Sequence, residues 1–210
     1  IVNGNVVHDT KHGIALSVED ESGDAPVSAK LLNVLVSNNR VYENDQDGII
    51  ITDFGHARLR DKIMILNNTV VANVRHGINI GSDKVDNVFI VNNLVSSNGG
   101  DQIVRDNRVD STQFISRNNL VWRSNGGTAC NGNLPSFGNA IGTNVVCASP
   151  RLNAIDFSLQ ANSPAENAAH EGVVTVTGGA SITVSSEVTE DATDERRPLS
   201  YDIGAMEYFQ

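Results

Sequence analysis

Five polar side chains beside short glycine turns are the residues of this 210-residue sequence best suited to proton-transfer chemistry. They come from three similar segments, KHGIAL, QDGIII and RHGINI, in which polar residues precede a Gly and an apolar stretch. If the segments lie one above another, a carboxylate stands between two imidazoles. It would raise the pKa of each imidazole and leave one able to donate a proton. The five residues are Lys11, His12, Asp47, Arg75 and His76.

Such a cluster contains the groups that proton abstraction next to a carboxylate requires. The reaction needs a base, a cation that neutralises the carboxylate and an acid for the leaving oxygen. We therefore take the five residues as candidate catalytic residues. The alternative is a structural role, because the residue before a turn Gly is commonly polar and a stacked His and Asp can simply hydrogen-bond to each other.

The same stacking predicts substrate-binding side chains next to this cluster. His8 and Tyr42 fall in one outward-facing column, and Asp9 and Glu43 fall in the next. We take His8, Tyr42 and Glu43 as candidate substrate contacts.

Two inserted segments, Glu19 to Lys30 and Asp53 to Asp61, lengthen the first two copies of the repeat described below. Long loops at one edge of a solenoid often form the walls of a cleft. His56 and Arg58, in the second insertion, are therefore further candidate substrate contacts. Ordinary loop variation is the alternative.

Calcium is a candidate cofactor, because two segments of the sequence offer oxygen ligands. Oxygen-bearing side chains crowd the turn from Glu43 to Gly48, and Glu19 to Glu21 with Asp24 form a second acidic segment. Calcium takes six to eight oxygen ligands, and neither segment has the complete spacing of an EF-hand loop. A solvated acidic loop is the alternative in both places.

These residues can meet only if the chain repeats, and four segments with paired asparagines show that it does. The second Asn of successive pairs is separated by 29, 25 and 26 residues. Each copy contains apolar strands, an Asn-Asn corner and, in the first three, a Gly turn, without the apolar spacing of a helix. We predict an all-β fold, a right-handed parallel β-helix with three short strands per coil. The second asparagines are Asn39, Asn68, Asn93 and Asn119.

Equivalent residues of successive coils should lie about 4.8 Å apart and form columns. Four inward columns of apolar residues are expected to build the core, and strand alternation predicts that the first Asn of each pair points inward with them. Stacked amides of this kind form hydrogen-bonded ladders more readily than ligand sites. These first asparagines are Asn38, Asn67, Asn92 and Asn118.

An outward apolar stripe is expected on the first strand of each coil. Large apolar surfaces are rarely left exposed to water. We expect the C-terminal tail to cover this stripe, with self-association through a partner subunit as the alternative. The stripe comprises Leu35, Met64, Leu66, Phe89, Val91 and Ile115.

The repeat divides the chain into residues 1–125, the β-helix coils, and residues 126–210, a loop-rich last coil and capping tail. Ile1 begins in the middle of the pattern, so we expect the coils to be the C-terminal part of a longer helix. Cys130 and Cys147 are expected to form one loop-closing disulfide, which favours an oxidising compartment. Two unrelated buried thiols are the alternative.

Charge and hydropathy exclude two classes of partner. The formal net charge is −10, while the stretch from Leu31 to Arg123 carries ten acidic and ten basic residues. A nucleic-acid-binding protein needs a basic face, which neither the total nor any cluster supplies. No apolar run is long enough to insert into a membrane. An acidic glycan remains compatible with the neutral coils.

The last part of the chain carries four short motifs: Asp156 to Leu159, Ser163 to Ala165, Arg197-Pro198 and Asp202 to Tyr208. Together with the coils, they resemble the closing segment of secreted bacterial right-handed β-helix proteins. These are pectate-lyase-like, or parallel β-helix repeat, proteins with a choice-of-anchor Q type ending. The approach to the Arg, from Asp191 to Arg197, lacks the Gly of the family pattern, so this loop is expected to differ.

The resemblance implies a secreted or cell-surface protein of polysaccharide lyase, epimerase or hydrolase type. It would act on or bind a polysaccharide, including one of uronic acids. A non-catalytic glycan-binding, adhesive or structural surface module is the alternative.

Overall fold

The computed structural model of the chain describes residues 1–18, 30–52, 59–110, 112–123, 144–193, 196–197 and 202–206. Within these ranges the regular secondary structure consists of short strands and one short helix, α1 (Val184–Glu187). No described helix has the length and apolar character needed to span a membrane. The predicted boundary between residues 125 and 126 lies outside the described ranges.

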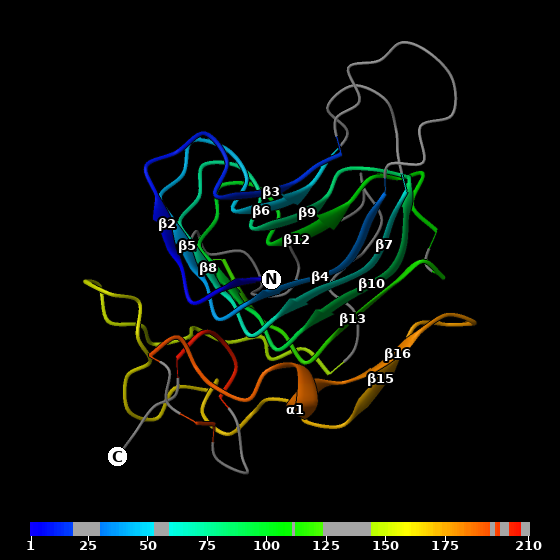
Figure 1. The fold of residues 1–210 in the computed structure, drawn as a ribbon. Helices are drawn as coiled ribbons and strands as arrows, with labels where there is room; N and C mark the ends of the chain where they lie inside the picture. Colours follow the sequence, from blue (N-terminus) through cyan, green and yellow to red (C-terminus); the bar gives the residue numbers. More distant parts are fainter. Residues whose placement is uncertain are drawn as a thin grey trace.

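Three parallel sheets enclose the core, and the chain visits them in turn, so that each sheet gains one strand per coil (Figure 1). The first sheet contains β1 (Val2–Asn3), β4 (Leu31–Ser37), β7 (Arg60–Leu66), β10 (Val85–Val91) and β13 (Phe114–Arg117). The second contains β2 (Val6–His8), β5 (Arg40–Tyr42), β8 (Thr69–Val71), β11 (Leu94–Ser96) and β14 (Leu120–Trp122). The third contains β3 (Ile14–Leu16), β6 (Ile49–Ile51), β9 (Ile78–Ile80) and β12 (Ile103–Arg105).

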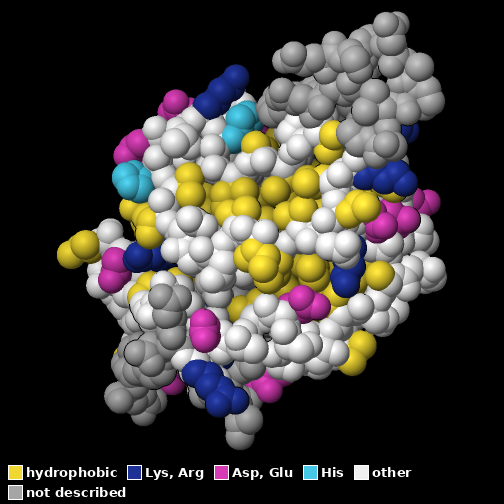
Figure 2. All heavy atoms as spheres, in the orientation of Figure 1, with side chains coloured by type: hydrophobic (Ala, Val, Ile, Leu, Met, Phe, Trp, Pro, Cys, Tyr) yellow, Lys and Arg dark blue, Asp and Glu magenta, His cyan; other side chains and the backbone are white. Residues whose placement is uncertain are grey.

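This architecture is a right-handed parallel β-helix, as the sequence predicts. The strand registers place the equivalent residues of successive coils opposite one another, for example Val34 with Ile63 and Ile63 with Val88. The inward columns pack into one apolar core, which fills the space between the three sheets. Figure 2, viewed along the solenoid, shows apolar side chains in the centre and most charged ones at the periphery.

The asparagine ladder exists, but the prediction that the first Asn of each pair forms it is wrong. The second asparagines form it: Nδ2 of Asn39 donates to Oδ1 of Asn68, and Nδ2 of Asn68 to Oδ1 of Asn93, both at 2.9 Å. The reason is backbone conformation. Each first Asn has a positive φ, between 52° and 59°, and this left-handed residue ends the strand alternation on which the prediction relied.

Three of the four first asparagines, Asn38, Asn67 and Asn92, instead hold the C-terminal tail. Nδ2 of Asn38 donates to the carbonyl of Glu190 at 2.7 Å. Asn92 makes two hydrogen bonds of 2.8 Å with the backbone N–H and carbonyl of His170. The corners of successive coils therefore form a row of docking points for the tail.

The tail covers the apolar stripe of the first sheet, which confirms the prediction. A hairpin of β15 (Val173–Thr175) and β16 (Ser181–Thr183), followed by α1, lies against β7, β10 and β13 (Figure 1). Phe89 at the centre of the stripe is completely buried. The stripe and the tail form one cluster, to which the tail contributes Val174, Val176, Ile182, Val184 and Val188. Its burial makes the partner subunit proposed for this face unnecessary.

Cys147 is among the described residues, whereas Cys130 lies outside them. The disulfide between them therefore stays a prediction.

Candidate functional site

The turns that lead into β3, β6, β9 and β12 stack in register. Ile14, Ile49, Ile78 and Ile103 are aligned across these strands, so the residues two positions earlier form a column as well. Backbone N–H groups of the turn glycines donate to carbonyls of the next coil at 2.9 to 3.0 Å. The resulting column of alternating imidazoles and carboxylates consists of His12, Asp47, His76 and Asp101.

A second amide ladder beside these turns fixes their conformation. Its hydrogen bonds of 2.7 to 2.9 Å link the side chains of Asn44, Asn73, Asn98 and Gln102. Glycine is required where the turn crosses this ladder. A Cβ on Gly48 would lie 2.4 Å from Cγ1 of Val70 and 2.8 Å from Nδ2 of Asn73. The glycines thus serve close packing between coils.

Asp47 is the centre of the predicted catalytic cluster, and it is completely buried. Its Oδ1 accepts a hydrogen bond from the backbone N–H of His76 at 3.2 Å. Its Oδ2 lies 3.6 Å from Nδ1 of His12 and 3.7 Å from Nη1 of Arg75. A buried carboxylate requires such compensation, because removing a charge from water is costly. The structure therefore brings four of the five predicted residues into contact, whereas their catalytic role stays a prediction.

The same contacts leave the two imidazoles mostly buried. The side chains of His12 and His76 are 13% and 16% exposed, whereas that of Arg75 is 52% exposed. Lys11 is exposed, and it makes no ion pair with a described residue. Asp47 is therefore well placed to hold the coils together and poorly placed to touch a substrate.

A small cavity opens beside Arg75 and His76 of this cluster. It has a volume of about 190 Å³. Its walls come from the turn before β9, from the outward faces of β9 and β12, and from the residues that follow these strands. The lining residues are Arg75, His76, Asn79, Gly81, Val104 and Asp106.

The outward column of the second sheet contains the predicted contacts His8 and Tyr42. The strand registers extend the column from them through Val71 and Ser96 to Trp122. The rings of His8 and Tyr42 stack, with centroids 4.9 Å apart and an interplanar angle of 9°. One face of the β-helix therefore carries aromatic side chains at both ends of a column that runs along the solenoid.

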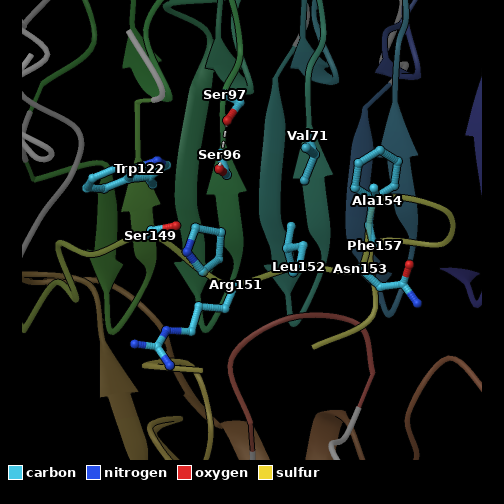
Figure 3. A pocket seen from close by; sticks show the side chains of 11 residues that line it. Val71, Ser96, Ser97, Trp122, Ser149, Arg151, Leu152, Asn153, Ala154 and Phe157 are labelled. Carbon is cyan, nitrogen blue, oxygen red and sulfur yellow. Dashed lines mark hydrogen bonds between the residues drawn. The ribbon is translucent and has the colours of Figure 1, made fainter. Parts of the chain in front are cut away.

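The tail crosses this column and turns it into a groove of about 310 Å³ (Figure 3). We call it the axial groove. Figure 3 shows Trp122 and Phe157 toward its two ends, with the side chains of the sheet and of the tail between them. Tyr42 continues the aromatic row, 4.8 Å from the ring of Phe157. The groove is lined by Val71, Ser96, Ser97, Trp122, Ser149, Pro150, Arg151, Leu152, Asn153, Ala154 and Phe157.

A turn stabilised by Asp156 holds Phe157 in this position. The carboxylate of Asp156 accepts hydrogen bonds from the hydroxyl and the backbone N–H of Ser158, at 2.7 and 3.0 Å. These bonds from Ser158 lower the pKa of Asp156 below its ordinary value, and the nearby charge of Arg40 adds to the effect. The carboxylate form of Asp156 therefore favours the turn.

The remaining predicted contacts lie apart from the groove or outside the described residues. Glu43 is exposed, with a positive φ at the end of β5. His56 and Arg58 lie outside the described residues, as does the acidic segment from Glu19 to Asp24. Within the described ranges, no group of three or more His, Cys, Asp or Glu side chains is arranged to hold a metal ion.

Sequence reasoning missed most of the groove. Trp122 follows the fourth Asn pair at the same offset at which Tyr42 follows the first, so the alignment of the repeats was sufficient to find it. Asp101, which lies outside the groove, precedes Ile103 as His76 precedes Ile78, so the alignment of the repeats places it in the column of His12, Asp47 and His76. Arg151 and Asn153 belong to the tail, which has no repeat, and no signal in the sequence placed them at the sheet.

No protein-family model matches this sequence, and no curated protein sequence is significantly similar to it. The fold implied by the resemblance to pectate-lyase-like proteins is confirmed, whereas membership of that family stays a prediction. Functional inference therefore rests on the geometry of the described residues.

Proposed function

We propose that this β-helix is an extracellular glycan-binding protein, and that an extended polysaccharide binds in the axial groove. The observation that carries the proposal is the groove itself, in which Trp122, Phe157 and polar side chains share one elongated cavity. A secreted or cell-surface location is part of the proposal. Its support is the predicted disulfide and the resemblance of the closing motifs.

The chemistry of the groove suits a sugar. Aromatic rings offer flat apolar surfaces to the C–H faces of a pyranose, and a few polar groups around them fix its orientation. Ser97 supplies a hydroxyl, Asn153 supplies an amide, and the exposed residue Arg151 supplies a guanidinium. The guanidinium would also tolerate or favour an acidic sugar, including a uronic acid.

The direction of the groove suits a chain of sugars. Ser96 pairs with Val71 on one side and with Trp122 on the other, and each step between coils is about 4.8 Å. A ligand that lies along the column therefore contacts side chains at a regular interval, one coil after another. Tyr42 and His8 extend the aromatic surface beyond Phe157 in the same direction.

Catalysis by the predicted cluster is the second candidate, and the burial of Asp47 argues against it. The carboxylate already has a hydrogen-bond donor and two cationic or imidazole neighbours. A general base must reach the proton that it abstracts. We therefore favour binding over lyase, epimerase or hydrolase chemistry.

A panel of soluble polysaccharides tests the proposal by affinity electrophoresis, with neutral glucans, galactans and polyuronates as ligands. At least one should retard the protein. Trp122→Ala should then weaken binding about tenfold or more, and Arg151→Gln should weaken it less. Trp122→Phe should keep a substantial part of the affinity, because it retains an aromatic face.

Arg123→Gln is the matched control, since Arg123 follows Trp122 but does not line the groove. Melting curves should accompany every variant, because Trp122 also contacts the apolar cluster beneath the tail. Binding that survives Trp122→Ala and Arg151→Gln in folded protein would refute the groove as the site. Release of unsaturated or reducing-end products from the same glycans, abolished by His76→Ala, would instead favour the catalytic candidate.

A further inference from the structure

We propose that the cavity beside His76 is a second binding site, separate from the axial groove, and that it takes a small oxyanion. The ligand chemistry is a carboxylate, sulfate or phosphate group. It arrives either as a free ion or as a substituent of a larger molecule. The proposal does not depend on the glycan proposal, because the two cavities share no lining residue.

The tautomer of His76 favours an anion as the ligand of this cavity. The backbone N–H of Asp101 donates to Nδ1 of the ring at 3.0 Å, so Nδ1 acts as an acceptor. In the neutral ring the proton must then reside on Nε2, which becomes a hydrogen-bond donor. Gly100 supports this arrangement, because a Cβ there would lie only 2.8 Å from Nδ1. The ring is thus held in one orientation by the turn of the next coil.

Arg75 brings a positive charge to the same cavity. Its Nη1 lies 3.7 Å from the buried Oδ2 of Asp47, which anchors one side of the guanidinium. The side chain is nevertheless 52% exposed and lines the cavity. A planar guanidinium carries five N–H donors, so an anchored one still has donors for an oxyanion.

The carboxylate in the cavity wall, that of Asp106, is already paired with a neighbouring side chain. The carboxylate of Asp106 accepts three hydrogen bonds from Arg108: Oδ1 from the backbone N–H and from Nε, both at 2.9 Å, and Oδ2 from Nη2 at 3.0 Å. The hydrogen bond from the Arg108 side chain lowers the pKa of Asp106, which keeps this carboxyl ionised and paired.

The side chains of Arg75 and His76 therefore remain as the donors of the wall. Asn79 adds a side-chain amide on the outward face of β9, where it is aligned with Val104 of β12. Asp47 and Asp101, the other nearby carboxylates, do not line the cavity. A cavity with an excess of donors is best satisfied by a ligand that brings acceptor atoms. Its volume of about 190 Å³ suits a small group rather than a full oligosaccharide.

Calorimetric titration of the whole chain at low ionic strength, with inorganic phosphate, sulfate and acetate, tests the site. At least one of the three ions should bind saturably with one site per chain. Asn79→Asp should abolish this binding, because it places a negative charge in the wall at nearly constant volume. Arg75→Gln should weaken it about tenfold.

Asn107→Asp is the matched control, since it adds the same charge at an exposed residue that does not line the cavity. It should leave binding almost unchanged. The absence of saturable binding by all three ions, or equal losses in Asn79→Asp and Asn107→Asp, would overturn the proposal. A sulfated oligosaccharide that binds more tightly than inorganic sulfate would identify the anion as a glycan substituent, whereas equal affinity would identify a free ion.

Discussion

At the scale of single residues, two adjacent asparagines at each corner have different tasks. Asn68 belongs to the buried ladder, where its Nδ2 donates to carbonyls of Val36 and Leu66 and to Oδ1 of Asn93. Asn67 has a φ of 53° and donates to the carbonyl of Asp202 in the tail at 3.4 Å. At one position the asparagine side chain pairs buried hydrogen-bonding groups of the core, and at the preceding position it binds the tail.

This division predicts unequal costs of substitution. Asn68→Ala leaves several buried donors and acceptors unpaired and should lower the free energy of unfolding by about 2–4 kcal/mol. Asn67→Gly keeps the left-handed conformation and should cost about 1 kcal/mol or less. Equilibrium unfolding in urea measures both values. Equal losses in the two variants would contradict the assignment of the ladder to the second Asn.

A second residue-scale prediction concerns Asp156. Its pKa in the folded protein lies below its ordinary value of 3.8 because Ser158 donates to the carboxylate. The stabilisation is therefore complete above the ordinary value, and it is lost as the pH falls below that value and through the lowered pKa of the folded state.

Asp156→Asn should accordingly have a lower melting temperature than the unsubstituted protein at pH 6. The difference should shrink as the pH falls below about 4. Melting curves recorded from pH 6 downwards measure it, and a difference that persists unchanged into strong acid would show that the charge of Asp156 is not the cause.

At the scale of elements, the tail acts as a cover for the first sheet. The β15–β16 hairpin and α1 bury Met64, Phe89 and their neighbours, which are apolar side chains that would otherwise face water. The sequence predicts this cover from the stripe alone, because a row of large apolar residues on an outward face needs a partner. It does not reveal the path of the tail, since the tail has no repeat that fixes its register.

Two neighbouring valines of β15 test the cover. Val174 is 1% exposed and packs against the stripe, whereas Val173 is 60% exposed. Val174→Ala should lower the free energy of unfolding by about 2 kcal/mol, and Val173→Ala should change it by less than about 0.5 kcal/mol. The comparison is internally controlled, because both substitutions remove the same atoms from one strand. Indistinguishable effects would mean that the hairpin does not pack on the sheet.

At the scale of the whole molecule, periodicity decides what the sequence can predict. Columns such as Ile14 to Ile103 follow from the repeat, and the register confirms them. The stacking of His12, Asp47 and His76 follows from the repeat as well. The burial of these side chains does not follow from it, because burial depends on how the turns pack against the next coil. The axial groove forms where the non-repeating tail meets the repeating second sheet. Only the side of the groove that contains Trp122 could therefore be predicted from the sequence.

Trp122 offers a direct probe of glycan binding in the axial groove, because it is the only tryptophan of the chain. Its fluorescence should shift or quench saturably when a glycan that retards the protein in electrophoresis is titrated in. The midpoint should match the affinity found by electrophoresis, and Arg151→Gln should move both together. Saturable glycan binding that leaves the fluorescence of Trp122 unchanged at every concentration would place the ligand elsewhere and contradict the account.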